Sequence, residues 1–582
     1  MNTSVSNSPA LRKTRSFGAG EVLLVISIAI LVIVVVVPVA LIFFNAMWVP
    51  GKGFNITDIV DVLSEPETYE ALTNSIIIAC GTTTMSTIVG TFFAWLVTRT
   101  DIPYKSFMKM LFLVPFMLPS FIGALAWKML LNERIGYINN WLRSLYDVIG
   151  IADGPVFNIY SFHGIMMVET MYLFPFVFIQ VSGALERMDP TLEESARISG
   201  ASLFTITRKI TIPLVLPSIL SGALLIMLYS MAHFGTVAVL GVQVGIINIP
   251  YLIYQHIHQS AGSFAAIRTG TVLAAVLVVT AAIIMWTQNK ILSRGRYQII
   301  GGKSFRPVEV KLRGLRIPLF VFSIAYIGFT IALPTITIFL VGGLKTYGLP
   351  LVLENMTWDN YHRALFVNPQ TQRAIWNSVS LGLSAAVITM FAGVIISYVI
   401  VKMKVRGKGI LEFLGMLPFS VPGSVIALGV ILAWGGGHTI PFTGIQINLY
   451  NTVWIILVAY IARYMALSLR ANSAALEQVH DSLIEAARAC GAGMAQSLRD
   501  VVLPLVRPGM IAAFFLIFLP ALRELTVSVM LYGTNTRTIG VEIYVLNEDG
   551  ATVESAALAG IALLIIISGQ VIIERLTGVR AK

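Results

Sequence analysis

The sequence alternates long apolar runs with short polar segments. A membrane-spanning helix needs about 20 mostly apolar residues, and by that rule the chain contains twelve such runs. They lie near residues 22–44, 72–97, 107–131, 162–183, 214–240, 268–288, 317–342, 374–401, 410–434, 450–470, 507–532 and 555–575. Prolines or glycines in the third, fifth and eleventh runs predict bent or broken spans, which membrane helices tolerate when neighbours satisfy the freed backbone groups. We therefore expect an all-α polytopic membrane protein with about twelve transmembrane helices.

Composition supports a bilayer environment. Of 582 residues, 56% are hydrophobic and only 12% are charged, more apolar surface than a soluble chain of this length can bury. The net charge of +11 does not indicate nucleic-acid binding, because the cations cluster in short loops on alternate sides of the apolar runs. Cys80 and Cys490 are the only cysteines, so we expect neither a disulfide nor a metal cluster.

The distribution of charge predicts the orientation in the membrane. Basic residues mark one side: Arg99 and Lys105, the segment 289–316, the loop 402–408 and the tail 575–582. The loop 45–71 on the other side is acidic. The positive-inside rule therefore predicts cytoplasmic N- and C-termini. The first run follows Arg12, Lys13 and Arg15, but its apolar core is too long for a signal peptide, so we expect an uncleaved first span.

A polar segment between the fourth and fifth spans recurs between the tenth and eleventh. Residues 192–217 align with residues 483–508 at a constant offset of 291, which pairs Glu194 with Glu485, Ala196 with Ala487, Arg197 with Arg488, Gly200 with Gly491, Pro213 with Pro504 and Pro217 with Pro508. Each copy predicts a short helix with small residues on one face, a glycine turn, and a second helix ended by proline. Two matched cytoplasmic segments indicate docking of two copies of a soluble partner, or of one symmetric dimer.

The repeat extends over most of the chain. Asn74-Ser75 matches Asn377-Ser378, and the Pro115 and Pro119 pair matches Pro418 and Pro422, at an offset of 303. The change of offset from 303 to 291 places twelve extra residues in the external region 132–161 of the first half. We expect two six-span repeats of the same orientation, with a substrate path between them. The first repeat comprises residues 1–288, with a docking loop at 184–217, and the second comprises residues 317–582, with a docking loop at 475–508. The basic linker 289–316 joins them. Asn74 and Asn377 are expected to cap their helices.

The two docking segments resemble the EAA signature of ABC importer permeases. The matching residues are Glu194, Ser195, Ala196, Gly200 and Pro213 in the first copy, and Glu485, Ala486, Ala487, Gly491 and Pro504 in the second. Ser195 and Ile212 in the first copy and Val501 in the second are mild departures from the pattern. The resemblance implies the type I importer permease fold, in a bacterial inner membrane, with each segment acting as a coupling helix seated in a groove of a separate ATPase.

The same resemblance implies the partners and cofactors. They are two copies of an ABC ATPase subunit, which would hold ATP and Mg²⁺, and a periplasmic or lipid-anchored substrate-binding protein. No cofactor or metal is expected on this chain, and no catalytic site. Gly302-Lys303-Ser304 has the end of a phosphate-binding loop, but the first glycine of that motif would fall on Tyr297 in a basic linker, so we reject it.

Ionisable residues inside the apolar runs are candidates for the translocation path, because their exposure to lipid costs several kcal/mol. Glu524 follows Arg523 in the eleventh span, and its counterpart at the offset of 291 is His233 in the fifth. This acid and histidine either flank a cationic solute or gate the path, or else Glu524 pairs locally with Arg523 and the histidine is satisfied by a neighbouring helix. Glu169 in the fourth span and Arg463 in the tenth suggest a bridge between the halves, as a structural clamp rather than a substrate site.

Two further features are weaker candidates. His256 and His258 are placed in the external loop after the fifth span, where a metal contact is possible but solvated histidines are the more common case. The segment 435–438 is expected to form a flexible external turn.

The whole pattern predicts a single-chain, two-repeat permease that resembles the ferric-iron importers. Permeases for 2-aminoethylphosphonate, thiamine or polyamines remain alternatives within the superfamily. An ion-coupled secondary transporter is the alternative from another class, although it would not need matched cytoplasmic docking segments.

Overall fold

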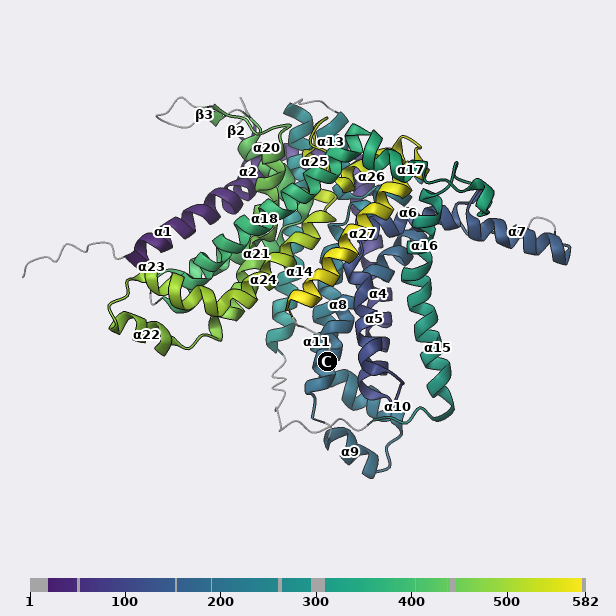
Figure 1. The fold of residues 1–582 in the computed structure, drawn as a ribbon, viewed down its shortest axis with the longest axis horizontal. Coiled ribbons are helices and arrows are strands. Elements are labelled where there is room, and N and C mark those ends of the chain that lie inside the picture. The colour runs from purple at the N-terminus through teal and green to yellow at the C-terminus, as the bar shows by residue number, and fades with distance from the viewer. Residues whose placement is uncertain are drawn as a thin grey trace, which may run out of the picture.

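The computed structural model describes residues 19–49, 53–151, 154–189, 191–259, 264–294, 309–403, 405–436, 438–439 and 446–577. Two arms of long helices diverge from a shared region (Figure 1). The N-terminal cations, the Gly302-Lys303-Ser304 segment and the linker residues 295–308 lie outside the described part of the chain.

The first half contains helices of very different lengths. In chain order they are α1 (Ala19–Leu31), η1 (Val32–Val36), α2 (Val37–Met47), α3 (Thr57–Ser64), α4 (Pro66–Arg99), α5 (Lys105–Met117), α6 (Ser120–Leu131), α7 (Tyr137–Ile149), α8 (Phe162–Arg187), α9 (Thr191–Ile198), α10 (Leu203–Ile206), η2 (Thr207–Thr211), α11 (Ile212–Met231), α12 (Gly235–Leu240), η3 (Val242–Val244), α13 (Ile249–Gln259) and α14 (Phe264–Arg294).

The second half follows a similar order, without a counterpart of α7 among the described residues. Its helices are η4 (Arg313–Leu315), α15 (Arg316–Ile327), η5 (Gly328–Ala332), α16 (Leu333–Gly342), η6 (Leu353–Asn355), α17 (Asp359–His362), η7 (Arg363–Val367), α18 (Pro369–Lys402), α19 (Lys408–Ser420), α20 (Gly423–Trp434), α21 (Val453–Glu477), α22 (Asp481–Ala489), α23 (Met494–Ser497), η8 (Leu498–Val502), α24 (Leu503–Leu522), α25 (Thr526–Leu531), α26 (Ile539–Glu548) and α27 (Thr552–Thr577). Two short hairpins pair β1 (Trp48–Val49) with β2 (Gly53–Phe54) and β3 (His438–Thr439) with β4 (Gln446–Ile447). β3 begins at the last residue of the segment 435–438 expected to form a turn.

The predicted spans are confirmed. The described residues contain ten helices long and apolar enough to cross a membrane, and two bent helix pairs that bring the number to as many as twelve. The third span bends by 90° between α5 and α6. The fifth and eleventh break after α11 and α24, where α12 and α25 begin, as the prolines and glycines of these spans predicted.

The sequence analysis missed a bend in the ninth span. α19 and α20 meet at an angle of 112°, the counterpart of the bend between α5 and α6. Pro418 lies inside α19 and Pro422 precedes the first residue of α20. These prolines match Pro115 and Pro119 in the repeat, so the alignment of the halves already contained the signal. A proline removes one backbone donor and disfavours helical geometry in the residue before it.

Prolines do not end the second helix of either docking segment, so that expectation is wrong. Pro213 and Pro504 lie at the second positions of α11 and α24, which continue for 20 residues each. In both cases a π-helical turn, η2 or η8, ends two residues before the proline. In a regular helix the proline ring would clash with the carbonyl four residues earlier. Here that carbonyl lies in the wider π-helical turn. The same arrangement precedes Pro38 and Pro334.

The first span of each half packs against the other half. Leu31 and Val35 of the first span share one buried cluster with Leu411 and Met465 of the second half. Conversely, the seventh span packs on the first half, where the ring of Phe329 lies 4.6 Å from that of Trp127. The two repeats are therefore interlocked rather than side by side.

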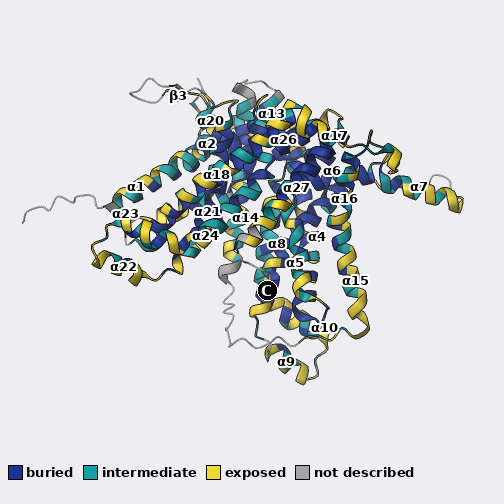
Figure 2. Cartoon of the chain, in the orientation of Figure 1, coloured by how far each residue is buried: buried dark blue, intermediate teal, exposed yellow. Residues whose placement is uncertain are grey.

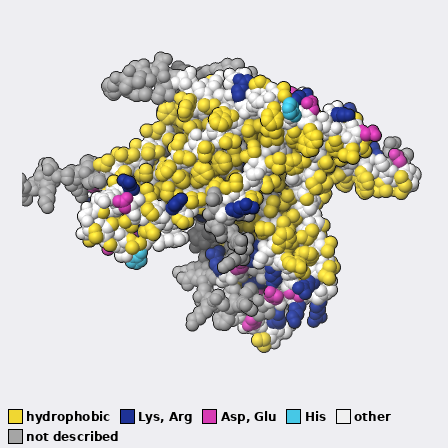
Figure 3. All heavy atoms as spheres, in the orientation of Figure 1, with side chains coloured by type: hydrophobic (Ala, Val, Ile, Leu, Met, Phe, Trp, Pro, Cys, Tyr) yellow, Lys and Arg dark blue, Asp and Glu magenta, His cyan; other side chains and the backbone are white. Residues whose placement is uncertain are grey.

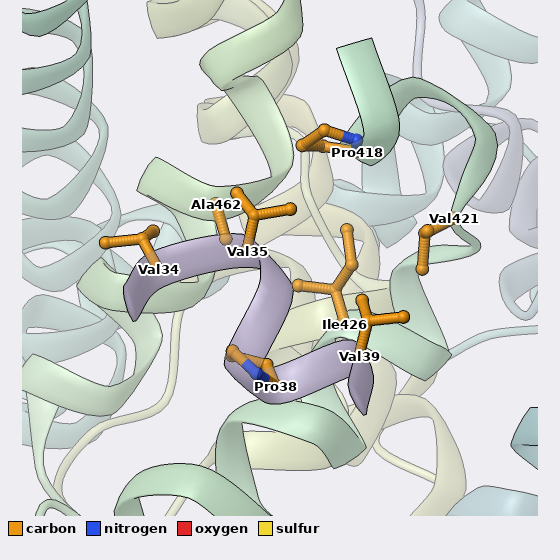
Figure 4. A pocket seen from close by; sticks show the side chains of 8 residues that line it. All are labelled: Val34, Val35, Pro38, Val39, Pro418, Val421, Ile426 and Ala462. Atoms are coloured by element: carbon orange, nitrogen blue, oxygen red, sulfur yellow. The ribbon is translucent and has the colours of Figure 1, made fainter. Parts of the chain in front are cut away.

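Figure 4 shows one of these crossing points in detail. Val35 and Pro38 of the first span face Pro418, Val421 and Ile426 across a small apolar pocket, at the bend between α19 and α20. Close approach is possible nearby because α20 carries Gly429, where a Cβ atom would lie 2.7 Å from the carbonyl oxygen of Pro38. A larger residue there would push the first span away.

Burial is greatest where the two arms meet and falls toward their ends (Figure 2). The largest buried cluster contains side chains of both halves, among them Trp127, Phe234, Tyr460 and Val527. Hydrophobic side chains also cover most of the visible outer surface of the arms (Figure 3). Such a surface suits lipid and not water.

Candidate functional site: docking helices and buried polar clusters

The first docking helix is α9, at the end of one arm (Figure 1). The carboxylate of Asp189 accepts the backbone N–H of Thr191 (2.9 Å) at the start of this helix. Hydrogen bonds from Thr191 lower the pKa of Asp189. The helix stops before Gly200, whose φ of +80° is in the left-handed region that glycine adopts without strain. Glu194 and Ala196 are half-buried.

The second docking helix is α22, at the end of the other arm (Figure 1). It is followed by Gly491 with a φ of +86°, so both copies have the same helix and left-handed turn. Glu485 and Ala486 are exposed and Ala487 is half-buried. The structure thus forms the predicted short helix and glycine turn twice, at positions related by the offset of 291.

The docking helices present side chains that have no partner within the chain. Neither Glu194 nor Glu485 makes a hydrogen bond or ion pair in the described part of the protein. Large apolar side chains nearby are exposed, with Ile198 at 88% and Phe204 at 73%. Exposed apolar groups beside unpaired charges are typical of a surface that binds another protein.

Each docking helix is tethered to the end of the second span of its half. In the first half, Arg99 at the end of α4 lies 3.7 Å from Glu193, which also accepts a hydrogen bond from Thr211 (2.6 Å). In the second half, Lys402 at the end of α18 contacts Asp481 (2.7 Å). Arg99 and Lys402 are related by the offset of 303. The sequence analysis missed these tethers because Glu193 and Asp481 are not equivalent positions of the repeat.

The described end of the linker lies beside the first tether. The backbone N–H of Val310 donates to the carbonyl of Arg99 (2.8 Å), and Lys105 forms an ion pair with Glu309 (2.5 Å). The basic loops, this end of the linker and both docking helices therefore share one end of the molecule.

A buried polar cluster joins four elements of the first half. Glu169 of α8 is fully buried and accepts hydrogen bonds from Thr82 (3.1 Å) and Ser230. His233 lies between α11 and α12, with Nδ1 2.9 Å from the Glu169 carboxylate and Nε2 2.8 Å from the Ser120 hydroxyl. The break in the fifth span and the bend in the third are thus linked through one histidine.

The second half has a cluster of different composition at the equivalent break. Glu524 contacts the guanidinium of Arg463 (3.2 Å) and accepts hydrogen bonds from the hydroxyl of Tyr464 (3.0 Å) and the backbone N–H of Val527 (3.0 Å). Gly423 leaves space for this arrangement, because a Cβ atom there would lie 1.6 Å from Arg463 Nη1.

The predicted bridge between Glu169 and Arg463 is wrong. Each of these residues pairs within its own half, Glu169 with His233 and Arg463 with Glu524. Arg523 instead makes a contact between the halves, by donating to the backbone carbonyl of Phe116 (2.6 Å). The sequence shows which residues carry charge in a span, but pairing depends on helix rotation, which is set by packing.

The Asn-Ser pairs do not cap helices, contrary to the expectation. Both lie inside long helices, α4 and α18. The amide of Asn74 donates to the carbonyl of Ile247 (3.0 Å), and Asn377 donates to that of Arg537 (2.9 Å). The adjacent serine hydroxyls, Ser75 and Ser378, accept the backbone N–H groups that begin α13 and α26. Each pair therefore holds the segment that follows the broken span.

The remaining candidate residues lie outside these clusters. His256 and His258 lie on the helix α13 and not in a loop. The ring of His258 stacks against Tyr532 at 5.1 Å, and burial lowers the pKa of His258. Within the described residues, no group of three or more His, Cys, Asp and Glu side chains is placed to hold a metal ion. Cys80 and Cys490 are both free thiols.

Comparison with known proteins gives consistent results. The ferric transport system permease protein FbpB of Actinobacillus pleuropneumoniae is 26% identical over 533 residues, which is 90% of this chain and 74% of FbpB. The Fe(3+)-transport system permease protein FbpB 2 of Haemophilus influenzae is 25% identical, with 88% of this chain and 90% of the relative covered. The spermidine/putrescine permease PotB of Escherichia coli is 30% identical over 172 residues, 30% of this chain and 61% of PotB.

Among solved structures, a chain of a bacterial alginate ABC transporter, crystallised with its alginate-bound periplasmic protein, aligns with a TM-score of 0.36 and 19% identity. The alignment covers 45% of this chain and 95% of that chain. A family model matches the present chain twice, over residues 86–296 and 385–577. These two matches contain both docking helices and, except for Thr82, both polar clusters, and they cover more than half of the chain. On this ground, the chain belongs to the family of binding-protein-dependent transport system inner membrane components.

Proposed function

We propose that this chain is a two-repeat permease of an ABC importer that admits ferric iron. The observation that carries the proposal is the pair of matched docking helices, α9 and α22, each with an unpaired glutamate and an exposed surface. Similarity to ferric permeases over most of the chain supports iron as the solute. We infer that the end with the basic loops is cytoplasmic, as are both termini.

ATP hydrolysis is assigned to partner subunits, and this chain to conversion of their movement. Two ATPase subunits, each with ATP and Mg²⁺, would hold α9 and α22, which lie at the ends of separate arms (Figure 1). Closure of the ATPase dimer would bring the arms together and turn the path from inward-open to outward-open. The tethers through Arg99 and Lys402 would carry this movement into α4 and α18.

The translocation path is assigned to the region between the two polar clusters. The side chains of Arg463 and His233 are 25% and 22% exposed, although their partners Glu524 and Glu169 are almost fully buried. A partly exposed polar side chain that is held by a buried carboxylate is positioned to meet a solute while it keeps its own partner. Because the described residues offer no group of three metal-ligating side chains, selection of iron is assigned to the external binding protein.

The docking assignment is tested by charge reversal. The double variant Glu194→Lys, Glu485→Lys is expected to insert normally, to lose the ATPase subunits on purification, and to lose ATP-dependent uptake. The matched control reverses two exposed carboxylates at the acidic end, Glu67→Lys with Glu70→Lys, and should retain the ATPase subunits. Undiminished uptake by the docking variant would refute coupling through these helices.

The solute is tested separately. The complex in proteoliposomes, with its binding protein, is given radioactive iron(III), spermidine, thiamine or 2-aminoethylphosphonate. Iron accumulation that requires ATP supports the proposal. Accumulation of spermidine in place of iron would support the polyamine alternative, for which the local similarity to PotB is the specific observation. Uptake without ATPase subunits, driven by an ion gradient, would contradict the whole mechanism.

A further inference from the structure

The helix α7 belongs to neither the docking surface nor the polar clusters. It lies in the external region 132–161 of the first half and extends sideways from the bundle, across the direction of the neighbouring spans (Figure 1). It has 13 residues, a length of about 20 Å, which is too short to cross a bilayer.

The sequence of α7 is amphipathic. Its exposed apolar residues lie at helical spacing along one face: Trp141, Leu145, Val148 and Ile149, with exposures of 65%, 40%, 84% and 57%. The polar residues Asn140, Arg143 and Asp147 lie at helical spacing on the other face.

The base of α7 is fixed in position. Asn139 is fully buried, and its amide donates to the carbonyls of Leu131 (3.2 Å), Asn132 (3.0 Å) and Phe157 (2.8 Å). The hydroxyl of Tyr137 donates to the carbonyl of Leu349 in the second half (3.3 Å). Contacts on both halves hold the helix across the spans, so its apolar face has a fixed direction.

The direction of that face indicates what covers it. In Figure 3 the apolar side chains of the projecting helix lie on the side that faces the docking helices, and charged side chains lie on the opposite side. The bilayer is on the side that faces the docking helices, because the spans run from this helix toward them. The apolar face is close to the hydrophobic surface of the adjacent arm (Figure 3). A helix with apolar residues toward the membrane, charges toward water and an exposed tryptophan fits the boundary between lipid headgroups and acyl chains.

We propose that α7 is an interfacial helix that lies flat in the outer leaflet, with Trp141, Leu145, Val148 and Ile149 in lipid. The ligand is the bilayer surface itself. The helix braces the outer end of the first half laterally, where α6 and the loop at Leu349 meet. The inference rests on membrane residence and on the geometry of α7, and not on the identity of the solute.

The test uses spin-label accessibility in the full chain. Cys80 and Cys490 are replaced by serine, and a single label is attached at Val148→Cys on the apolar face or, as the matched control, at the exposed Asp147→Cys on the polar face. The protein is placed, one copy per disc, in phosphatidylethanolamine–phosphatidylglycerol nanodiscs. Collision rates are measured with oxygen, which concentrates in lipid, and with a water-soluble nickel chelate.

At position 148 we expect oxygen to be favoured over nickel several-fold, and at position 147 the reverse. Equal nickel accessibility at both positions would place the helix in water and overturn the proposal. Protection of position 148 from both reagents, particularly on addition of the external binding protein, would show that a protein covers this face, and would also overturn it. Each variant's melting temperature, compared with that of the cysteine-free chain, shows whether the fold is retained.

Discussion

Removal of the Glu193 carboxylate should weaken the first docking helix far more than the corresponding change weakens the second. In the variant Glu193→Ala, the guanidinium of Arg99 loses the one charge that faces it within the described residues. The Arg99 side chain is 1% exposed and Glu193 is 10% exposed, so water cannot replace the lost partner. The guanidinium nitrogens make no hydrogen bonds within the described part of the chain.

The magnitude follows from burial. Removing one partner of a buried ion pair costs about 3–5 kcal/mol, because the remaining charge stays desolvated. The separation of 3.7 Å is long for such a pair, so we expect about 3 kcal/mol, the lower end of that range. The hydrogen bond from Thr211 is lost as well, which for a charged acceptor contributes about 1.5–3 kcal/mol within the same total.

The matched control is Asp481→Ala in the second half. The Lys402 side chain is only 6% exposed, but Asp481 is 70% exposed, so water screens this pair and we expect a cost of about 1 kcal/mol, the upper end of the range for exposed pairs. Lys402 also keeps its bond to the carbonyl of Val479 (2.5 Å). The two variants remove the same chemical group at the two docking helices, but the remaining Lys402 keeps a backbone hydrogen bond, whereas the remaining Arg99 makes none in the described part of the chain.

The assay is thermal and denaturant unfolding of the permease with its ATPase subunits in nanodiscs, together with ATP-dependent uptake. A double-mutant cycle with Arg99→Met isolates the pair, because the methionine removes the charge that Glu193→Ala strands. Equal destabilisation by Glu193→Ala and Asp481→Ala, or a coupling energy near zero in the cycle, would refute the assignment of a buried tether.

Three further outcomes are expected. Gly491→Ala should destabilise the second docking helix by about 1–2 kcal/mol, because alanine is strained at the φ of +86° even though no atom lies within 4 Å of the added Cβ. Gly493 has ordinary backbone geometry, so Gly493→Ala should have no such effect. Limited proteolysis of the docking helix compares the two variants. Glu169→Gln should lower the free energy of unfolding by about 1–3 kcal/mol, because the charge-assisted contact with His233 is lost. The ATPase subunits should stay bound to this variant. Loss of these subunits would contradict a docking site that is separate from the polar cluster. Burial lowers the pKa of His258, so the unfolded chain binds a proton at this residue more readily than the folded chain. The stability of the fold should therefore decrease as the pH drops below the usual histidine pKa of about 6.5. If the melting temperature of His258→Gln depends on pH in the same way as that of the parent protein, this prediction is wrong.

The spans and docking segments were predictable because their signals are local. About 20 apolar residues in sequence determine a membrane helix whatever surrounds it, and the repeated Glu–Gly–Pro pattern marked both docking helices by spacing alone. The bend at Pro418 was also encoded, through its match with Pro115. The π-helical turns before Pro213 and Pro504 were not expected, because continuation of a helix past a proline depends on how the preceding turn widens.

The pairing of ionisable side chains inside the bundle could not be predicted from the sequence in the same way. The sequence by itself determined that the chain is a two-repeat membrane protein with ionisable residues in its fourth, fifth, tenth and eleventh spans, because hydropathy and spacing act along the chain. Only the tertiary structure decided that Glu169 meets His233 and Arg463 meets Glu524, that Arg523 reaches Phe116, and that each first span packs on the opposite half. These contacts depend on the rotation and crossing of helices far apart in sequence, which are set by the packing of all their side chains at once.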